Sequence, residues 1–306
     1  MACGTVKSQV SYLKRLPLYQ KEKPFQLFIP IDKEALDQRT TNLDFETKER
    51  TFVDVRDTAY SCSLDVDGFQ LQSYPTKLDL PSFLDRSIVE SQYFSEVEEI
   101  LKNIEGGYDK LFIFDWRIRS SATPRMGNEF DMNDLTTWLR PSPTVHVGWA
   151  MLITSPKRHG EPVTGKSPSG QVEFPTAICV CLLLIDYSVW RPLEHVVEDY
   201  PLAFCDPESI SADDLVECDH VRRKFKGATL YAHFNDTHKW SYIGNHRPDE
   251  VLLMKMFDSD TSVKARRLAH ASFRHPAITE HSKPRKSIEV RALVFNFPGT
   301  GTFKCA

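Results

Sequence analysis

The stretch that most constrains this chain is an alternation of polar and apolar residues near its end. Between residues 287 and 295, Ser287, Glu289 and Arg291 occupy alternate positions, and the residues between them are apolar. A period of two is typical of a β-strand that buries one face. The apolar face would pack into a core. The polar face, with Arg285 just before it, would form a wall of guanidinium and hydroxyl groups.

Such a wall suits a carboxylate ligand, because a guanidinium group binds a carboxylate through two donors and a nearby hydroxyl can add a third hydrogen bond. The alternative is a half-solvated strand whose arginines pair with surface acids. Residue types alone favour that alternative.

Composition narrows the class of protein. The chain has 306 residues, 41% of them hydrophobic, which is enough for a large core. We expect a single domain over residues 1–306, with an extended N-terminal arm over about residues 1–50. A net charge of −4 with dispersed basic residues argues against nucleic-acid and membrane-surface partners. The seven cysteines include no C-x-x-C, so neither a disulfide framework nor a zinc-thiolate site is expected.

No apolar run is long enough to span a membrane, since the longest, residues 177–185, has the length of a buried strand. The N-terminus lacks the apolar core of a signal peptide. These features predict a soluble, cytoplasmic protein.

One helix and many strands are predicted. Residues 87–104 carry apolar residues at a spacing of three to four, and Gly106-Gly107 would end this helix. Residues 51–56 and 60–71 are expected to form a hairpin. The other expected strands are residues 110–117, 177–189, 228–234, 240–243, 251–256 and 287–295.

Residues 155–171, rich in Gly, Pro and Ser, are expected to roof a pocket. Short strands with long connections predict a mainly β protein, a double-stranded β-helix or jelly roll of the cupin-like kind, with flanking helices.

The motif Arg285-Lys-Ser287, fifteen residues after His270, resembles the 2-oxoglutarate clamp of non-haem iron oxygenases. In those enzymes the last metal-binding histidine precedes an R-x-S that holds the far carboxylate of the cosubstrate. They also carry an earlier H-x-D. Here His146-Val-Gly148 stands in that place, with glycine at the carboxylate position.

Further motifs, in order along most of the chain, resemble the fungal AsaB-type hydroxylase/desaturase family. They include Pro17-Leu-Tyr19, Val53-Asp-Val-Arg56, Ile113-Phe-Asp-Trp-Arg117, Val189-Trp-Arg-Pro192 and the closing segment Arg285 to Arg291. The resemblance implies a double-stranded β-helix, iron(II) and 2-oxoglutarate as cofactors, and a tailoring reaction on a small natural product of secondary metabolism. It also implies that His146 and His270 bind the metal and that Arg285 and Ser287 hold the cosubstrate.

Because Gly148 supplies no carboxylate, three functions remain open. In the first, iron still binds through the two histidines and 2-oxoglutarate, and the protein oxidises or halogenates its substrate. In the second, no cofactor acts, and His146, His270, Arg285 and Arg291 catalyse a redox-neutral cyclisation, dehydration or rearrangement. In the third, the chain is a non-catalytic partner of an active homologue. A homodimer or heterodimer is possible, and Trp149 is expected to line the pocket.

For most of the other polar residues, we expect positions in turns, on the surface or in structural roles. His233, His238 and His246 are expected in a hairpin and its turn, and His220 on a solvated surface with Arg222. Arg191 is expected to have a structural role. Asp186 and Glu161 would replace the lost carboxylate only if the fold brought them beside His146.

Overall fold

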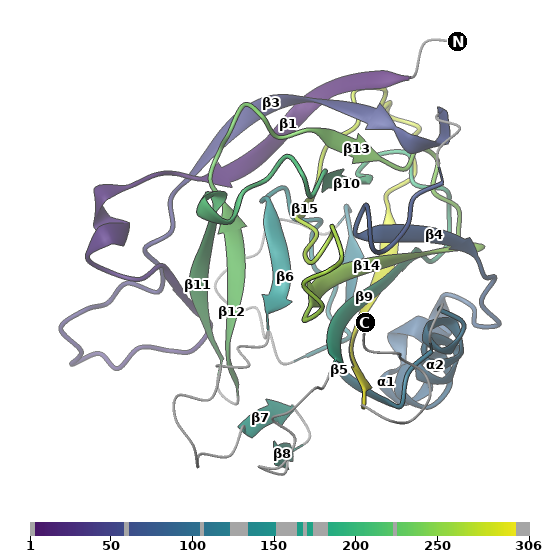
Figure 1. Ribbon diagram of the computed structural model, residues 1–306, viewed down its shortest axis with the longest axis horizontal. Helices are drawn as coiled ribbons and strands as arrows, with labels where there is room; N and C mark the ends of the chain where they lie inside the picture. Colours follow the sequence, from purple (N-terminus) through teal and green to yellow (C-terminus); the bar gives the residue numbers. More distant parts are fainter. Residues whose placement is uncertain are drawn as a thin grey trace.

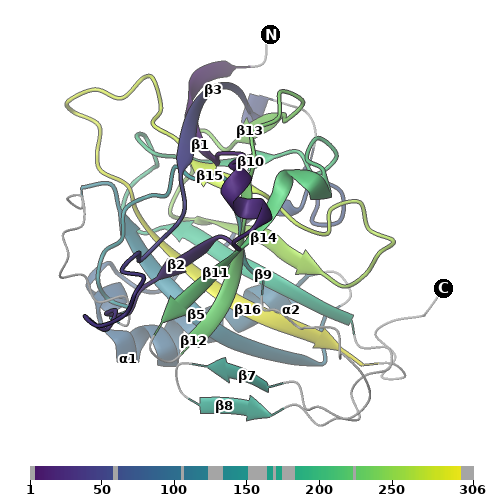
Figure 2. The same ribbon diagram turned by 90° about the vertical axis from the view of Figure 1, so that its left-hand side faces the viewer.

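The chain folds into two β-sheets that face each other (Figure 1). The computed structural model describes residues 4–57, 61–104, 107–122, 134–150, 164–167, 170–173, 183–222 and 225–297. The sheets form a double-stranded β-helix, which confirms the predicted fold class. In Figure 2, strands of the larger sheet lie in front of the smaller sheet.

The smaller sheet has five strands in the order β4-β14-β9-β16-β5. Every neighbouring pair is antiparallel. The alternating stretch at the end of the sequence is β16, and it runs between β9 and β5. The strands are β4 (Phe69–Ser73), β5 (Lys110–Ser120), β9 (Leu183–Pro192), β14 (Glu250–Asp258) and β16 (Lys286–Asn296).

The larger sheet has nine strands in the order β1-β3-β13-β10-β15-β6-β12-β11-β2. Its strands are β1 (Thr5–Leu13), β2 (Phe25–Leu27), β3 (Phe45–Asp54), β6 (His146–Ala150), β10 (Leu202–Cys205), β11 (Leu215–Arg222), β12 (Phe225–Ala232), β13 (Trp240–Tyr242) and β15 (His270–Ser272). Two short strands, β7 (Thr164–Ser167) and β8 (Gly170–Glu173), pair with each other.

The predicted N-terminal arm is only partly an arm. Residues 5–13 are extended, as expected, but they form β1, which pairs with β3 along its whole length at the edge of the larger sheet. A short 3₁₀ helix follows at Pro17–Gln20. The apolar residues of β1, such as Val10 and Tyr12, are fully buried, so this strand contributes to the core.

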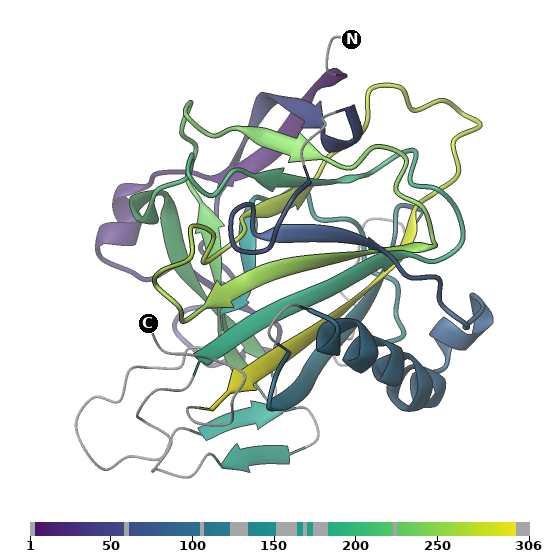
Figure 3. The same cartoon turned by 45° about the vertical axis from the view of Figure 1, so that its right-hand side comes forward.

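The predicted helix is confirmed. It runs through α1 (Arg86–Ile88), a π-helical segment (Val89–Tyr93) and α2 (Phe94–Lys102). At its start the Asp85 carboxylate accepts hydrogen bonds from the backbone N–H groups of Ser87 and Ile88, which satisfies two otherwise free donors. The helical segment covers the outer face of the smaller sheet (Figure 3).

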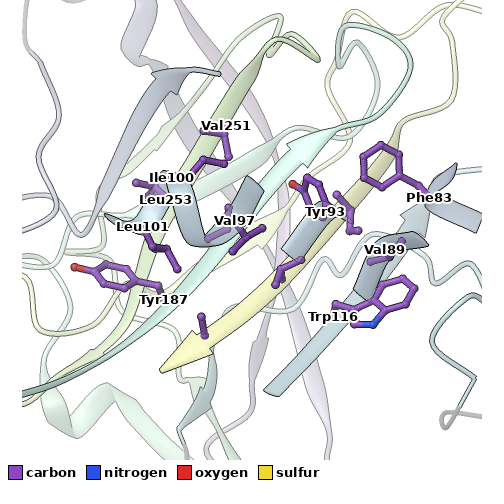
Figure 4. Close-up of a cluster of buried hydrophobic side chains, with 14 of the residues drawn as sticks. Phe83, Val89, Tyr93, Val97, Ile100, Leu101, Trp116, Tyr187, Val251 and Leu253 are labelled. Atoms are coloured by element: carbon purple, nitrogen blue, oxygen red, sulfur yellow. The ribbon is translucent and has the colours of Figure 1, made fainter. Parts of the chain in front are cut away.

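Apolar side chains fill the space between this helix and the sheet (Figure 4). Val97, Ile100 and Leu101 from α2 pack in one cluster with Val251 and Leu253 from β14. From β16 the same cluster receives Ile288, Val290, Ala292 and Val294. The apolar face of the alternating strand therefore packs against the helix, as its period predicts.

The polar face of β16 is buried as well. Ser287, Glu289 and Arg291 are 0%, 6% and 5% exposed, and they point into the interior between the two sheets. The half-solvated strand is therefore the wrong interpretation. A polar wall inside the barrel is consistent with a ligand site.

Two predicted hairpins are wrong. Strand β3 pairs with β1 and β13, whereas β4 pairs with β14 in the other sheet, so residues 51–71 connect the two sheets. Residues 64–67 do form a turn, and Gly68 after it has a φ of +80°, which favours glycine. Strands β12 and β13 are separated in their sheet by three others.

His220 is also not where the sequence predicted. It is 7% exposed on β11, where its ring lies 5.9 Å from the Tyr231 ring and 5.6 Å from the Phe28 ring. Burial lowers the pKa of His220 to about 4. Separately, none of the helices in the described ranges has the length and apolarity needed to cross a membrane.

Candidate active site

Two histidines from neighbouring strands meet at the centre of the larger sheet. His146 begins β6, His270 begins β15, and the two residues are direct cross-strand partners. Their ring centroids lie 4.5 Å apart. The structure therefore brings together two residues that are 124 positions apart in the sequence (270 − 146).

The hydrogen bonds of these rings fix which nitrogen faces the interior. Nδ1 of His146 lies 2.7 Å from the Thr144 carbonyl oxygen, and Nδ1 of His270 lies 3.2 Å from the Leu268 carbonyl oxygen. Since a carbonyl oxygen only accepts, each Nδ1 carries the proton and each Nε2 keeps a lone pair. Burial lowers the pKa of both histidines, which favours the neutral form. Metal-binding histidines have this arrangement.

Arg285 is buried, and three of the five N–H donors of its guanidinium group have no acceptor in the described part of the chain. Its Nη1 donates to the Tyr200 carbonyl oxygen at 2.6 Å and to Ser272 Oγ at 3.1 Å. Its Nε and Nη2, and the nearby Ser287 Oγ, have no partner in the described part of the chain. The guanidinium group lies 5.5 Å from the Trp190 ring centroid. Burial, followed by the Arg119 charge, lowers the pKa of Arg285 to about 9, so the group is still charged at neutral pH.

Nε and Nη2 form one edge of a guanidinium group, which is the edge that binds a carboxylate through two parallel hydrogen bonds. Leaving buried donors without acceptors costs about 1–3 kcal/mol each. The chain keeps three such donors together at Arg285 and Ser287, which fits a carboxylate ligand.

One cavity joins the histidine pair to this clamp. Its lining combines cationic, imidazole, hydroxyl and apolar groups from both sheets. The lining residues are Arg119, Ser142, His146, Trp190, Leu202, Met254, His270, Ala271, Ser272, Arg285 and Glu289.

Position 148 has glycine in place of the aspartate of the H-x-D pattern, and the space beside it is also occupied. A Cβ atom at Gly148 would lie 2.8 Å from the Met256 sulfur and 3.3 Å from its Cγ. The Met256 side chain from β14 thus occupies the space into which an aspartate would project. In the described ranges, no group of three His, Cys, Asp or Glu residues is placed to hold a metal ion.

Glu289 is the site residue that the sequence reasoning missed. It lines the cavity with both histidines, and its carboxylate accepts hydrogen bonds from Ser188 Oγ at 2.7 Å and from Arg291 Nε and Nη2 at 3.2 and 3.0 Å. Burial would raise the pKa of Glu289, but the Arg291 charge and others lower it below its ordinary value. The signal was available, because Glu289 lies on the same strand face as Ser287.

Arg291, a predicted catalytic residue, has a different position from the one expected. Its Nη1 donates to Asp115 at 2.9 Å and its other donors bind Glu289, so it holds two carboxylates and is absent from the described cavity lining. Asp186, on β9, is the cross-strand partner of Leu293 on β16, and it is also absent from the described cavity lining. Burial raises the pKa of Asp186 well above its ordinary value.

The outcome for the remaining predicted residues is mixed. Arg191 is absent from the described cavity lining, and its Nη2 donates to the Tyr74 carbonyl oxygen at 2.7 Å, which is consistent with the predicted structural role. Neighbouring Trp190 lines the cavity. The Trp149 side chain, Glu161 and most of the predicted roof at 155–171 lie outside the described residues.

Comparisons with known proteins place this chain among oxidoreductase-like proteins whose relatives depend on non-haem iron and 2-oxoglutarate. A family model described as "Oxidoreductase/YMDC permease-like domain" matches residues 10–295, and the chain belongs to this family. The chain is 29% identical to the Fe(II)/2-oxoglutarate-dependent dioxygenase nvfI of Aspergillus novofumigatus, over 84% of this chain and 87% of nvfI.

Other fungal relatives agree. The alpha-ketoglutarate-dependent dioxygenase tstK of Talaromyces stipitatus is 30% identical over 80% of this chain and 83% of its own length. The hydroxylase/desaturase asaB of Aspergillus flavus is 34% identical over 35% of this chain and 53% of asaB, which bears out the AsaB-type resemblance. A solved structure of the iron and alpha-ketoglutarate-dependent endoperoxidase NvfI superposes with a TM-score of 0.74 at 26% identity, covering 97% of this chain and 99% of that one.

Proposed function

We propose that this protein is an iron(II)- and 2-oxoglutarate-dependent oxygenase that modifies a small natural product of fungal secondary metabolism. One observation carries the proposal. The buried, unpartnered edge of Arg285, with Ser287 beside it, shares a cavity with two histidines whose Nε2 atoms are free to bind a metal.

Each residue has a defined task in this proposal. Arg285 Nε and Nη2 and Ser287 Oγ bind the far carboxylate of 2-oxoglutarate, while Ser272 and Tyr200 hold the Arg285 side chain in place. His146 and His270 would hold the iron through Nε2. When bound, iron and 2-oxoglutarate would together activate dioxygen, which is the oxidant for attack on an unactivated C–H bond while 2-oxoglutarate is converted to succinate. Trp190, Leu202 and Met254 give the cavity an apolar part that suits an apolar substrate and excludes water.

The absence of a carboxylate at position 148 bears on which oxidation a bound iron would perform. With glycine at position 148 and the Met256 side chain in the adjoining space, the chain offers no carboxylate ligand there, and the ligand positions that the two histidines leave would be filled by the cosubstrate, water or an anion such as chloride. Hydroxylation, desaturation, endoperoxide formation as in the NvfI neighbour, and halogenation all belong to this class of chemistry. Glu289, held by Arg291 and Ser188, keeps a fixed negative charge facing the histidine pair.

A redox-neutral reaction is the second candidate, and the position of Met256 favours it. The thioether stands where the third ligand would project, so the two histidines lack a carboxylate partner in the described residues. In that case His146, His270 and Arg285 would polarise a carbonyl group or move a proton without a cofactor.

A non-catalytic partner subunit has less support. Within the described ranges, the large apolar side chains that are exposed are Leu18, Leu36, Val66 and Leu84, which come from separate segments. A larger apolar patch would mark a protein interface. Dimerisation, with itself or with a homologue, stays a prediction.

The test is turnover of 2-oxoglutarate to succinate in the presence of iron(II) and oxygen. We expect Arg285→Gln to lower the rate at least about tenfold, because the variant loses a charge-assisted bidentate contact. Arg86→Gln, at an exposed arginine on the outer helix, is the matched control and should leave the rate unchanged. Full succinate formation by Arg285→Gln would remove the cosubstrate role. If activity on a natural substrate persists after a metal chelator is added, the redox-neutral reaction would be favoured.

A further inference from the structure

The cavity contains more guanidinium charge than the cosubstrate clamp requires. Arg291 is paired internally, because it binds both Glu289 and Asp115. Arg117 lies 3.6 Å from the same Asp115 carboxylate. These two arginines therefore balance the carboxylates that share the inner face of the smaller sheet with them.

Arg285 and Arg119 are different. Arg285 donates to a carbonyl and a hydroxyl oxygen, and Arg119 Nη1 donates to the Arg140 carbonyl oxygen at 2.8 Å. Neither forms an ion pair with a carboxylate in the described part of the chain. Two guanidinium groups, Arg285 fully buried and Arg119 half-buried, thus line one cavity without an ion pair, and Glu289 is the one carboxylate in its described lining. Burying unpaired charge is costly, so an anionic ligand would stabilise both.

Arg119 is a neighbour of the clamp and shares the cavity with the histidines. On β5 it lies directly opposite Ser287, a member of the clamp. It also lines the cavity together with His146 and His270, and its charge acts on both rings as well as on Arg285. A ligand that extends from Arg285 toward the histidines would pass Arg119.

We propose that this cavity binds a short dicarboxylate without a metal, with one carboxylate on Arg285 and Ser287 and the other on Arg119. Arg119 is then a positioning residue that holds the keto-acid end of the cosubstrate. This inference rests on the proposed function and deepens it. It also offers a physical reason why a site that lacks the carboxylate at position 148 could still hold its cosubstrate, since the guanidinium group provides an anchor that does not depend on iron.

The experiment is calorimetric titration of chelator-treated protein with glutarate and with pentanoate. These probes have the same chain length, and pentanoate carries a methyl group in place of one carboxylate. We expect glutarate to bind wild-type protein at least about tenfold more tightly than pentanoate, because a second charge-assisted contact is worth about that factor. In Arg119→Gln the two probes should bind equally, and Arg119→Lys should keep part of the preference.

Arg117→Gln is the matched control, since Arg117 lies on the same inner face of β5 but belongs to the internal ion pairs. It should keep the preference for glutarate, and circular dichroism should show that all variants fold. Equal binding of the two probes by wild-type protein, or a preference that survives in Arg119→Gln, would overturn the inference. If metal-free protein binds neither probe but iron-loaded protein binds 2-oxoglutarate, the inference fails and the proposed function stands. If 2-oxoglutarate does not bind in either state, both fail.

Discussion

Met256 fills the space into which a side chain at position 148 would project. A glycine and a thioether on facing strands thus replace the aspartate of the H-x-D motif. A variant that restores a carboxylate ligand therefore needs space for its side chain as well as an acidic residue at position 148. The obstruction is the far part of a flexible side chain, so the surrounding backbone need not move.

This arrangement predicts a difference between two variants. Gly148→Asp alone should improve iron(II) affinity little, because its Cβ would contact the Met256 sulfur at 2.8 Å. Gly148→Asp combined with Met256→Ala should raise the affinity at least about tenfold by adding an anionic ligand. Anaerobic iron titration measures both, with Met256→Ala alone as the control. Equal, weak binding by all three variants would mean that position 148 does not face the metal.

At the scale of elements, β16 carries Ser287 and Glu289, and the sequence predicted this strand from its period. Its period of two separates a face that packs under the helix from a face that lines the interior. The sequence could not show that the polar face is enclosed, since enclosure depends on the opposite sheet. The motif identified Arg285 and Ser287. Glu289 was missed although it lies on the same strand face as Ser287, and Arg119 was missed because it becomes a neighbour of Ser287 only through the pairing of β5 with β16.

The errors at this scale share one cause. Residues 51–71 and 228–243 both alternate and contain turn residues, and adjacent strands usually pair when they are adjacent in the chain. In a double-stranded β-helix the chain instead passes between sheets or skips strands, so β3 and β4 lie in different sheets. Local patterns predicted β3, β12 and β13 as strands but not their partners, and of the described residues 61–71 only 69–71 belong to a strand, β4.

At the scale of the whole molecule, buried histidines make the fold sensitive to acid. Burial lowers the pKa of His220 to about 4 and that of His246 to about 3. In the unfolded chain these groups would titrate near their ordinary value of about 6.5. Below that pH the unfolded state therefore binds more protons than the folded state, and stability falls as the pH falls.

We expect the free energy of unfolding to decrease between about pH 6.5 and pH 4, by about 1.4 kcal/mol per pH unit for each of these histidines. Denaturant unfolding at a series of pH values measures this. A His220→Gln, His246→Gln double variant should show a shallower decrease. His281→Gln is the control, because the His281 side chain is 88% exposed. An unchanged slope in the double variant would show that other groups determine the acid sensitivity.

The measurement that tests the central claim most directly is the iron content of protein purified without oxygen and then mixed with iron(II) and 2-oxoglutarate. The proposed site predicts about one equivalent of bound iron, since the two histidines and the cosubstrate together provide one coordination sphere. His146→Ala and His270→Ala should each lose that iron while remaining folded. Folded wild-type protein that binds no iron under these conditions would contradict the claim and point to a redox-neutral reaction in the same cavity.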